Sequence, residues 1–308
     1  MSLTILEFLR ALLYGIIEGV TEWLPISSTG HLILIEGIPA LSLGSYLPPD
    51  VRDEFCELFN VVIQLGAILA VVSRQRSDLF GGFLPRRGEL HRGKSPGGRK
   101  ERRTTIVLWS KLAAATLPAA VLGLLLDTVT ETACGRDADS LLYTPTVVAA
   151  ALIVYGVIFI LIERGGRLTS PRISDISDIS HRRAFMIGIF QALSLIPGTS
   201  RSGSTVIGAR LLGVSRTAAT EFSFIMAAPA IAGASILKFA GFLRFAVTYG
   251  IRLPATAMIT LALASVAAFF VSQLTIDLLL SFAARHTFLV FGIYRIALGI
   301  AVLLLCGR

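Results

Sequence analysis

The stretch YGIIEGVTEWLPISSTGHLIL, residues 14–34, decides the fold, because it places carboxylates, a histidine and several hydroxyl groups inside a strongly apolar sequence. Glu18 and Glu22 are four residues apart, so on a helix they lie one turn apart on the same face. Pro25 is expected to stop that helix, because its ring removes a helical hydrogen bond and clashes with the preceding turn. An ionised carboxylate at bilayer depth costs roughly 2.5–3.5 kcal/mol. The pair therefore predicts a functional site that faces a wet cavity or a cation.

The composition is that of an integral membrane protein. Of the 308 residues, 54% are hydrophobic and 16% are charged, whereas a soluble domain has about 25% charged residues. The net charge of +8 is concentrated in two loops, which indicates membrane topology and predicts no nucleic-acid partner. No small-residue cleavage site precedes Glu18, so no removable signal peptide is expected. The three cysteines, Cys56, Cys134 and Cys306, have no metal-binding or redox spacing and are assigned no role.

Hydrophobic segments long enough to cross a bilayer predict about six transmembrane helices. They cover residues 56–73, 104–126, 144–162, 218–239, 253–274 and 287–305. Two further pairs of apolar segments are interrupted by proline and glycine and are too short to span: residues 3–24 with 31–39, and residues 184–196 with 204–213. Each pair predicts a re-entrant helical hairpin. The expected fold is an all-α polytopic membrane protein, with residues 1–308 as one integral membrane domain.

Loop charges predict the orientation of these segments. Residues 74–103 contain ten cations against three carboxylates, and residues 163–183 contain five arginines. Both loops are therefore expected in the cytoplasm, and the acidic loop at 127–139 outside. The centre of the first loop is rich in glycine, proline and charge, so we expect it to be disordered and solvated, in preference to a phosphate- or nucleic-acid-binding arm. The ISDISDIS tract in the second loop is interpreted as a low-complexity linker.

The opening pattern recurs in the second half of the chain. The segment GIFQ at 188–191 resembles GIIE at 15–18, and the serine-rich segment that follows Pro197 resembles the one that follows Pro25. Three spans, an odd number, separate the two hairpins, so the hairpins are expected to enter the membrane from opposite sides. Residues 1–163 and 184–308 are thus predicted to form an inverted repeat, which would place both broken helices near the midplane.

The segment PGTSRSGST, residues 197–205, predicts a phosphate site. Gly198 and Gly203 permit a nest of inward-pointing N–H groups, and Arg201 can grip a phosphate with two parallel hydrogen bonds. The helix expected after Thr205 would add its positive end. The full set of predicted phosphate-binding residues is Ser27, Thr29, Gly198, Ser200, Arg201, Ser202, Gly203 and Thr205.

The predicted catalytic residues combine both segments: Glu18, Glu22, Ser28, His31 and Arg201. A neutral imidazole such as that of His31 suits proton transfer to a leaving phosphate oxygen or attack on phosphorus. Glu18 and Glu22 could ligate Mg²⁺ or Ca²⁺, activate a nucleophile, or satisfy hydroxyl groups in a buried network, and the metal role is slightly preferred. Water, Ser28 and His31 all remain candidate nucleophiles.

EGVTEWLPISSTGHL and PGTSRSGST resemble the two signature motifs of the bacitracin-resistance type undecaprenyl-diphosphatases. FNVVIQLGAILAVV and TEFSFIMAAPA are also similar to that family, so the resemblance covers nearly the whole chain. The long basic loop at 74–103 departs from the family, which leaves the role of this loop open. Both motifs lie outside it.

The resemblance implies a multi-pass enzyme of the bacterial inner membrane. It would remove the terminal phosphate of undecaprenyl diphosphate, recycle the lipid carrier for peptidoglycan and other envelope polymers, and lower sensitivity to bacitracin. It also implies a divalent cation as cofactor and membrane lipid as a partner. Whether the protein forms a homodimer is left open. The family's functional residues map onto Glu18, Glu22, Ser28, His31, Ser200, Arg201, Ser202 and Thr205.

The rival prediction is a transporter or flippase of a phosphorylated polyprenyl lipid, because inverted repeats with midplane sites are also a transporter design. Both readings require phosphate binding. They differ in that hydrolysis needs a nucleophile and transport does not.

Overall fold

The computed structural model describes residues 3–83, 99–135, 138–165 and 171–307. Within these ranges, six helices are long and apolar enough to cross a membrane. They are Pro49–Arg74 (α3), Arg99–Cys134 (α5), Pro145–Arg164 (α7), Arg216–Thr248 (α10), Ala255–Arg285 (α11) and Leu289–Cys306 (α12). The expected all-α membrane fold is confirmed. The part of the chain described here contains no strand, and its one isolated bridge joins Ile173 to Val214.

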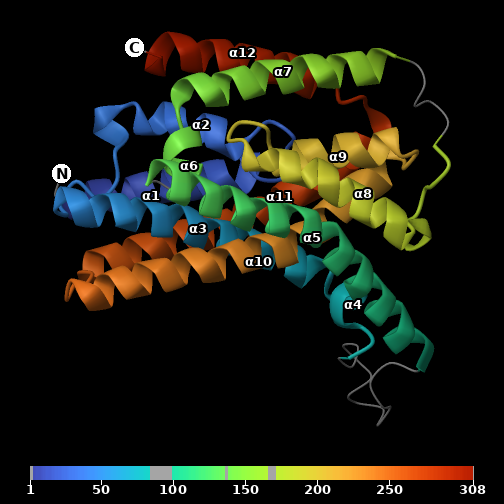
Figure 1. Ribbon diagram of the computed structural model, residues 1–308, viewed down its shortest axis with the longest axis horizontal. Coiled ribbons are helices and arrows are strands. Elements are labelled where there is room, and N and C mark those ends of the chain that lie inside the picture. The colour runs from blue at the N-terminus through green and yellow to red at the C-terminus, as the bar shows by residue number, and fades with distance from the viewer. Residues whose placement is uncertain (1–2, 84–98, 136–137, 166–170, 308) are drawn as a thin grey trace.

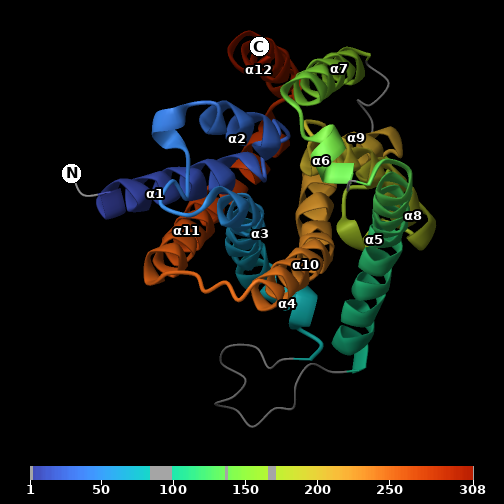
Figure 2. The same ribbon diagram turned by 60° about the vertical axis from the view of Figure 1, so that its left-hand side comes forward.

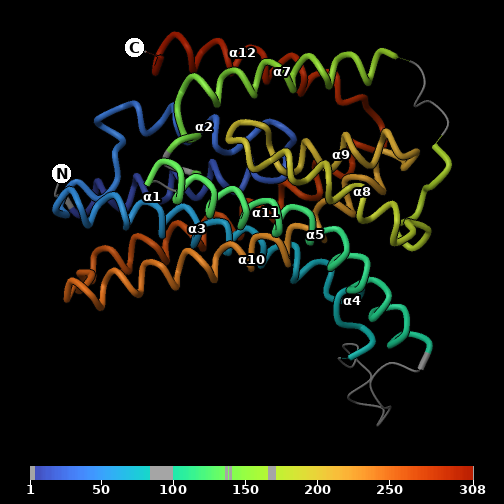
Figure 3. Tube along the Cα trace, viewed as in Figure 1, coloured from blue at the N-terminus to red at the C-terminus, as the bar shows by residue number. Residues whose placement is uncertain are grey.

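Two interrupted pairs of shorter helices complete the structure. The first pair is Leu3–Thr21 (α1) and Ser28–Glu36 (α2); the second is His181–Ala192 (α8) and Arg201–Leu211 (α9), with a 3-10 turn at Leu193–Leu195 (η4) between them. Figure 3 shows both breaks as loops in the middle of the molecule, one blue and one yellow. Short helices Arg76–Phe80 (α4) and Ala138–Leu142 (α6), and 3-10 turns at Pro39–Leu41 (η1) and Ile176–Asp178 (η3), lie in the connections.

Both breaks differ in detail from the sequence prediction. α1 ends at Thr21, four residues before Pro25, so the helix stops short of both the proline and Leu24, the residue that a following proline disfavours in helical conformation. α2 and α9 each begin three residues earlier than expected, because Ser27 and Ser200 act as N-caps. The Oγ atom of Ser27 accepts the N–H of Gly30 at 3.4 Å, and that of Ser200 accepts the N–H of Gly203 at 3.1 Å. The hydroxyl-rich segments are therefore helix N-termini.

The backbone of the two cap serines is nearly the same. Ser27 has φ 74° and ψ 107°, and Ser200 has φ 70° and ψ 118°. They are the non-glycine residues with positive φ among the residues described. A positive φ is costly for a residue with a Cβ, so the surrounding contacts must hold both serines in this conformation.

The breaks are supported by pairs of long helices that lie side by side. α7 packs along α12, α1 along α11, and α8 along α5 (Figures 1 and 2). Glycine permits two of these contacts. A Cβ on Gly15 would lie 2.2 Å from the carbonyl oxygen of Ala264 on α11, and a Cβ on Gly188 would lie 2.2 Å from that of Ala115 on α5. Small residues let the backbones of membrane helices approach this closely.

Replacing either glycine by alanine is expected to lower stability by about 1–3 kcal/mol, the usual cost of forcing a methyl group into a packed interface. Thermal unfolding of purified Gly15→Ala and Gly188→Ala in detergent would measure the effect. Gly241→Ala is the matched control, because nothing lies within 4 Å of its Cβ position on α10. Equal melting temperatures for all three variants would contradict the tight packing.

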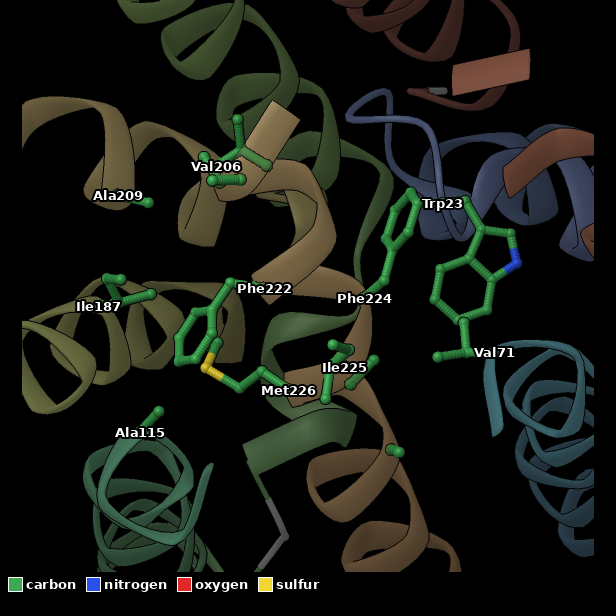
Figure 4. Close-up of a cluster of buried hydrophobic side chains, with 14 of the residues drawn as sticks. Trp23, Val71, Ala115, Ile187, Val206, Ala209, Phe222, Phe224, Ile225 and Met226 are labelled. Carbon is green, nitrogen blue, oxygen red and sulfur yellow. The ribbon is translucent and has the colours of Figure 1, made fainter. Parts of the chain in front are cut away.

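An apolar cluster anchors the first break to the rest of the molecule (Figure 4). Trp23, which lies in the break, is fully buried. Its ring meets that of Phe224 on α10 edge to face, with ring centroids 5.1 Å apart and an interplanar angle of 78°. The break is therefore part of the hydrophobic core.

The tract at 173–180 was expected to be a linker, and this expectation is wrong. Ile173 and Ile179 are buried. Lys111 on α5 donates to the carbonyl of Ser177 at 2.7 Å. Hydrogen bonds from Ser177 hold the pKa of the exposed Asp175 carboxyl below its usual range. The isoleucine repeat packs this connection against the bundle. Of the first basic loop, Arg99–Arg103 belong to α5, and its central residues 84–98 lie outside the described ranges.

Candidate functional site

The two breaks meet although they are far apart in the sequence. Arg201, the first residue of α9, donates from NH2 to Oε1 of Glu22 at 3.1 Å, across 179 residues of chain. The side chains are only 12% and 8% exposed. Ser202 adds a second link, since its Oγ donates to the carbonyl of Leu24 at 3.2 Å. The acidic segment and the arginine segment thus form one site.

Ser28 lies beside this ion pair. Its hydroxyl donates to Oε2 of Glu22 at 3.1 Å, while Oε1 of the same carboxylate holds Arg201. A carboxylate hydrogen-bonded to a hydroxyl can accept its proton when the oxygen attacks an electrophile. Glu22 is therefore placed to activate Ser28, or a water molecule in the same position.

Glu18 is the most unusual carboxylate of the site. It is fully buried, and neither of its oxygens has a hydrogen-bond donor within the described structure. Its carboxyl group lies against that of Glu22, one helical turn away. A buried ionised group without a partner is costly, and two carboxylates side by side increase that cost.

These two carboxylates fit a hard divalent cation. Mg²⁺ is commonly held by one or two carboxylates, with substrate phosphates and water as its other ligands. The unpartnered oxygens of Glu18 provide the free acceptors that such an ion needs. No group of three His, Cys, Asp or Glu side chains that could hold a metal occurs in the described ranges, so substrate and water would complete the shell.

Arg201 is held rigidly and still keeps one donor free. Its NH1 donates to the carbonyl of Ser223 on α10 at 2.9 Å, and its NH2 is bound by Glu22. Its Nε is buried and has no acceptor among the residues described. A guanidinium fixed at one end with a free N–H at the other is suited to bind an anion.

The rest of the predicted phosphate loop is arranged differently from the expected nest. Gly198 has the expected positive φ, of 92°, but its carbonyl and that of Thr199 point toward α12. Ser200 and Ser202 share a hydrogen bond of 3.2 Å at the start of α9. The N–H groups in the first turn of a helix lack intrahelical acceptors, so the start of α9 offers donors for an anion.

Three predicted phosphate ligands have other surroundings. The hydroxyl of Thr205 is completely buried and lies 2.6 Å from that of Ser223, so it joins α9 to α10. Thr29 is half-buried in the first turn of α2, and Ser27 is the N-cap of the same helix.

His31 lies one turn after Ser28, but its ring is engaged elsewhere. Its Nδ1 lies 2.7 Å from the carbonyl oxygen of Ser27. Its Nε2 lies 2.8 Å from the hydroxyl of Tyr294 on α12, and the two rings stack with an interplanar angle of 12°. In this arrangement neither nitrogen is free to attack phosphorus, which separates His31 from the pair formed by Ser28 and Glu22.

Arg295 on α12 is the main residue that the sequence prediction missed. It is completely buried, and it donates to backbone carbonyls of both breaks. NH1 binds the carbonyl of Pro25 at 3.2 Å, and NH2 binds those of Gly198 and Thr199, each at 2.8 Å. The available signal was the arginine in the apolar segment FGIYRIALGI, because a charge inside a spanning helix usually marks a functional site.

The family model for the bacitracin resistance protein BacA matches residues 11–301. The chain belongs to the BacA family. This match includes both breaks and the part of α12 that contacts them, so every site residue described above lies within the family's own sequence.

Similar BacA-family relatives come from several bacteria. An undecaprenyl-diphosphatase of Enterococcus faecalis is 43% identical over 305 residues, which cover 99% of each chain. Proteins of the same name from Acetivibrio thermocellus and Desulfitobacterium hafniense are 42% and 41% identical and cover 97–98% of both chains.

Proposed function

We propose that this BacA-family protein hydrolyses undecaprenyl diphosphate to undecaprenyl phosphate and inorganic phosphate. It would thereby recycle the lipid carrier for peptidoglycan and other envelope polymers, and confer resistance to bacitracin. Relatives that match over nearly the whole chain carry the name of this activity. The observation that carries the proposal is the meeting of Ser28, Glu22 and Arg201 in one buried site.

The geometry supports a division of roles among these residues. The free Nε of Arg201 and the start of α9 bind the terminal phosphate of the substrate. The Oγ atom of Ser28, or a water held in its place, attacks that phosphorus while Glu22 accepts the proton. The bond between phosphorus and the bridging oxygen breaks, and undecaprenyl phosphate leaves. If Ser28 attacks, water then hydrolyses the phosphoserine and releases inorganic phosphate.

Glu18 and Glu22 would hold Mg²⁺ or Ca²⁺ in this proposal. When bound there, such an ion would supply charge neutralisation of the diphosphate and polarisation of the phosphorus under attack. What supports it is the pair of adjacent carboxylates, of which Glu18 has two unpartnered oxygens in the described structure. Arg201 and the two carboxylates place charges of both signs in one site, where Glu22 and Arg201 form an ion pair.

The site lies at the junction of two re-entrant hairpins of an inverted repeat, in the bacterial inner membrane. Three similarities support the repeat. Ser27 and Ser200 share one backbone conformation, Glu18 and Gln191 each precede their cap serine by nine residues, and α1 packs on α11 as α8 packs on α5. Membrane lipid is then the immediate partner of the protein and the source of its substrate.

Release of inorganic phosphate from undecaprenyl diphosphate by the purified protein in detergent tests this function. Ser28→Ala should lower the rate, because it removes the hydroxyl that donates to Glu22, and Ser174→Ala should match the unaltered protein, since Ser174 is exposed in the connection before α8. Translocation of the lipid in vesicles without any phosphate release would instead support the transporter.

The proposed orientation predicts which cysteines an impermeant thiol reagent can reach. Native Cys134 is exposed at the end of α5, on the side expected to face outward. With Cys56 and Cys306 replaced by alanine, Cys134 should be labelled in intact cells. In a variant that also carries Cys134→Ala, a cysteine at the exposed Ser174 should be protected until the cells are lysed. Labelling in the opposite sense would overturn the orientation.

A further inference from the structure

His31 and Tyr294 form a pair that the proposed roles above do not use. The hydroxyl of Tyr294 lies 2.8 Å from Nε2 of His31, and the ring centroids are 5.7 Å apart with nearly parallel planes. The two residues come from α2 and α12, across 263 residues of chain. A histidine stacked on a tyrosine and hydrogen-bonded to it is fixed in both position and rotation.

The hydrogen bonds also fix the protons of the neutral ring. The carbonyl of Ser27, 2.7 Å from Nδ1, can only accept, so Nδ1 carries the hydrogen. Neutral imidazole has one N–H, and Nε2 is therefore the acceptor and Tyr294 the donor.

We infer that Tyr294 is a positioning residue for His31, which it holds in place as the Nδ1–H tautomer with Nε2 as the acceptor of the tyrosine hydroxyl. The effect of this arrangement on turnover rests on the phosphatase function proposed above. The tautomer and the hydrogen bond are properties of the folded protein alone, and they can be measured independently of it.

α12 gives this pair a rigid base. The residue next to Tyr294 is Arg295, whose guanidinium binds backbone carbonyls of both breaks. The helix that carries Tyr294 is thus tied to the segments before α2 and α9. Movement of Tyr294 relative to His31 would require breaking these buried hydrogen bonds.

The pair acts by position. With Nδ1–H on the Ser27 carbonyl and Nε2 on the Tyr294 hydroxyl, both ring nitrogens are engaged, so loss of the tyrosine donor would release Nε2 and let the imidazole turn.

Tyr294→Phe tests the inference in turnover, since phenylalanine keeps the ring but removes the donor. We expect kcat to fall about 10-fold with KM changed less than 2-fold, a fraction of the 10²–10⁴-fold that acid–base catalysis usually contributes. In a His31→Gln background the second substitution should have no further effect. Tyr249→Phe, in an exposed tyrosine at the end of α10, is the matched control and should be neutral.

Nitrogen NMR of the protein labelled with ¹⁵N-histidine provides a readout that does not depend on catalysis. The His31 signals, assigned from their loss in His31→Gln, should show a protonated Nδ1 and an unprotonated Nε2. Tyr294→Phe should shift the Nε2 signal and leave the Nδ1 signal protonated. An unmoved Nε2 signal, or the same activity loss with and without His31, overturns the inference. Absence of phosphate release from the unaltered protein overturns the proposed function alone.

Discussion

Arg201→Lys should lower kcat/KM for undecaprenyl diphosphate by about 10²-fold or more, the usual loss when a preorganised transition-state donor is removed. Lysine keeps the positive charge, but it has no planar fork of N–H groups. Its ammonium group cannot bind Glu22 and the carbonyl of Ser223 and at the same time present a donor to a phosphate at the position of the arginine Nε. Steady-state phosphate release, compared with the unaltered protein at equal purity, measures the loss.

Arg285→Lys is the matched control, because Arg285 is exposed at the end of α11 and the substitution changes the same chemical group. A melting temperature of Arg201→Lys close to that of the unaltered protein would assign the loss to the site. Near wild-type turnover in Arg201→Lys would remove this guanidinium from phosphate binding.

Removal of divalent cations should lower turnover of the purified enzyme by roughly 10³-fold or more, since the metal contribution to charge stabilisation is several kcal/mol. The physical reason is the repulsion among Glu18, Glu22 and the incoming diphosphate in a buried site. Mg²⁺ or Ca²⁺ added back should restore the rate. Glu18→Gln should raise the cation concentration needed for half-maximal activity, because Glu18 contributes the unpartnered oxygens.

The variants of the two carboxylates differ in what they disturb. Glu22→Gln also removes the partner of buried Arg201, and breaking a buried pair costs about 3–5 kcal/mol. Glu18→Gln leaves the Glu22–Arg201 ion pair in place and alters only the contact between the Glu18 and Glu22 carboxyl groups, so it isolates the metal effect better. Glu57→Gln is the control, since its ion pair with Lys238 is half-exposed and worth about 0–1 kcal/mol. Full activity in excess chelator, with bound metal excluded by elemental analysis, would rule out the proposed metal role of Glu18 and Glu22.

Sequence reasoning was sufficient for the features with a local pattern. The six spanning helices follow from runs of apolar residues, and the two breaks follow from Pro25 and Pro197 between short apolar segments. The expectation that the two interrupted segments meet predicted that Glu22 and Arg201 belong to one site, but not that they form an ion pair. Each of these predictions depends on a periodicity or on the cost of charge in a bilayer.

The missed features depend on contacts between distant segments. The helix starts at Ser28 and Arg201 required knowledge that two serines adopt a positive φ, which their local sequence disfavours. The charge of Arg295 in an apolar segment was a signal, but it did not identify the partners of Tyr294 and Arg295, which are more than 90 residues away. The tract at 173–180 looked like a linker because its packing partners, such as Lys111, belong to another helix.

The contacts of Arg295 also bear on how the protein is made. α12 follows all the other helices in the sequence, and the ribosome completes it after both breaks have emerged. Until then, the carbonyls of Pro25, Gly198 and Thr199 cannot receive the guanidinium that binds them in the finished structure. The Arg295 clamp is thus added only when α12 is inserted, so a nascent chain that stops before α12 joins the acidic and arginine segments through the contacts of Arg201 and Ser202 but without this buried guanidinium.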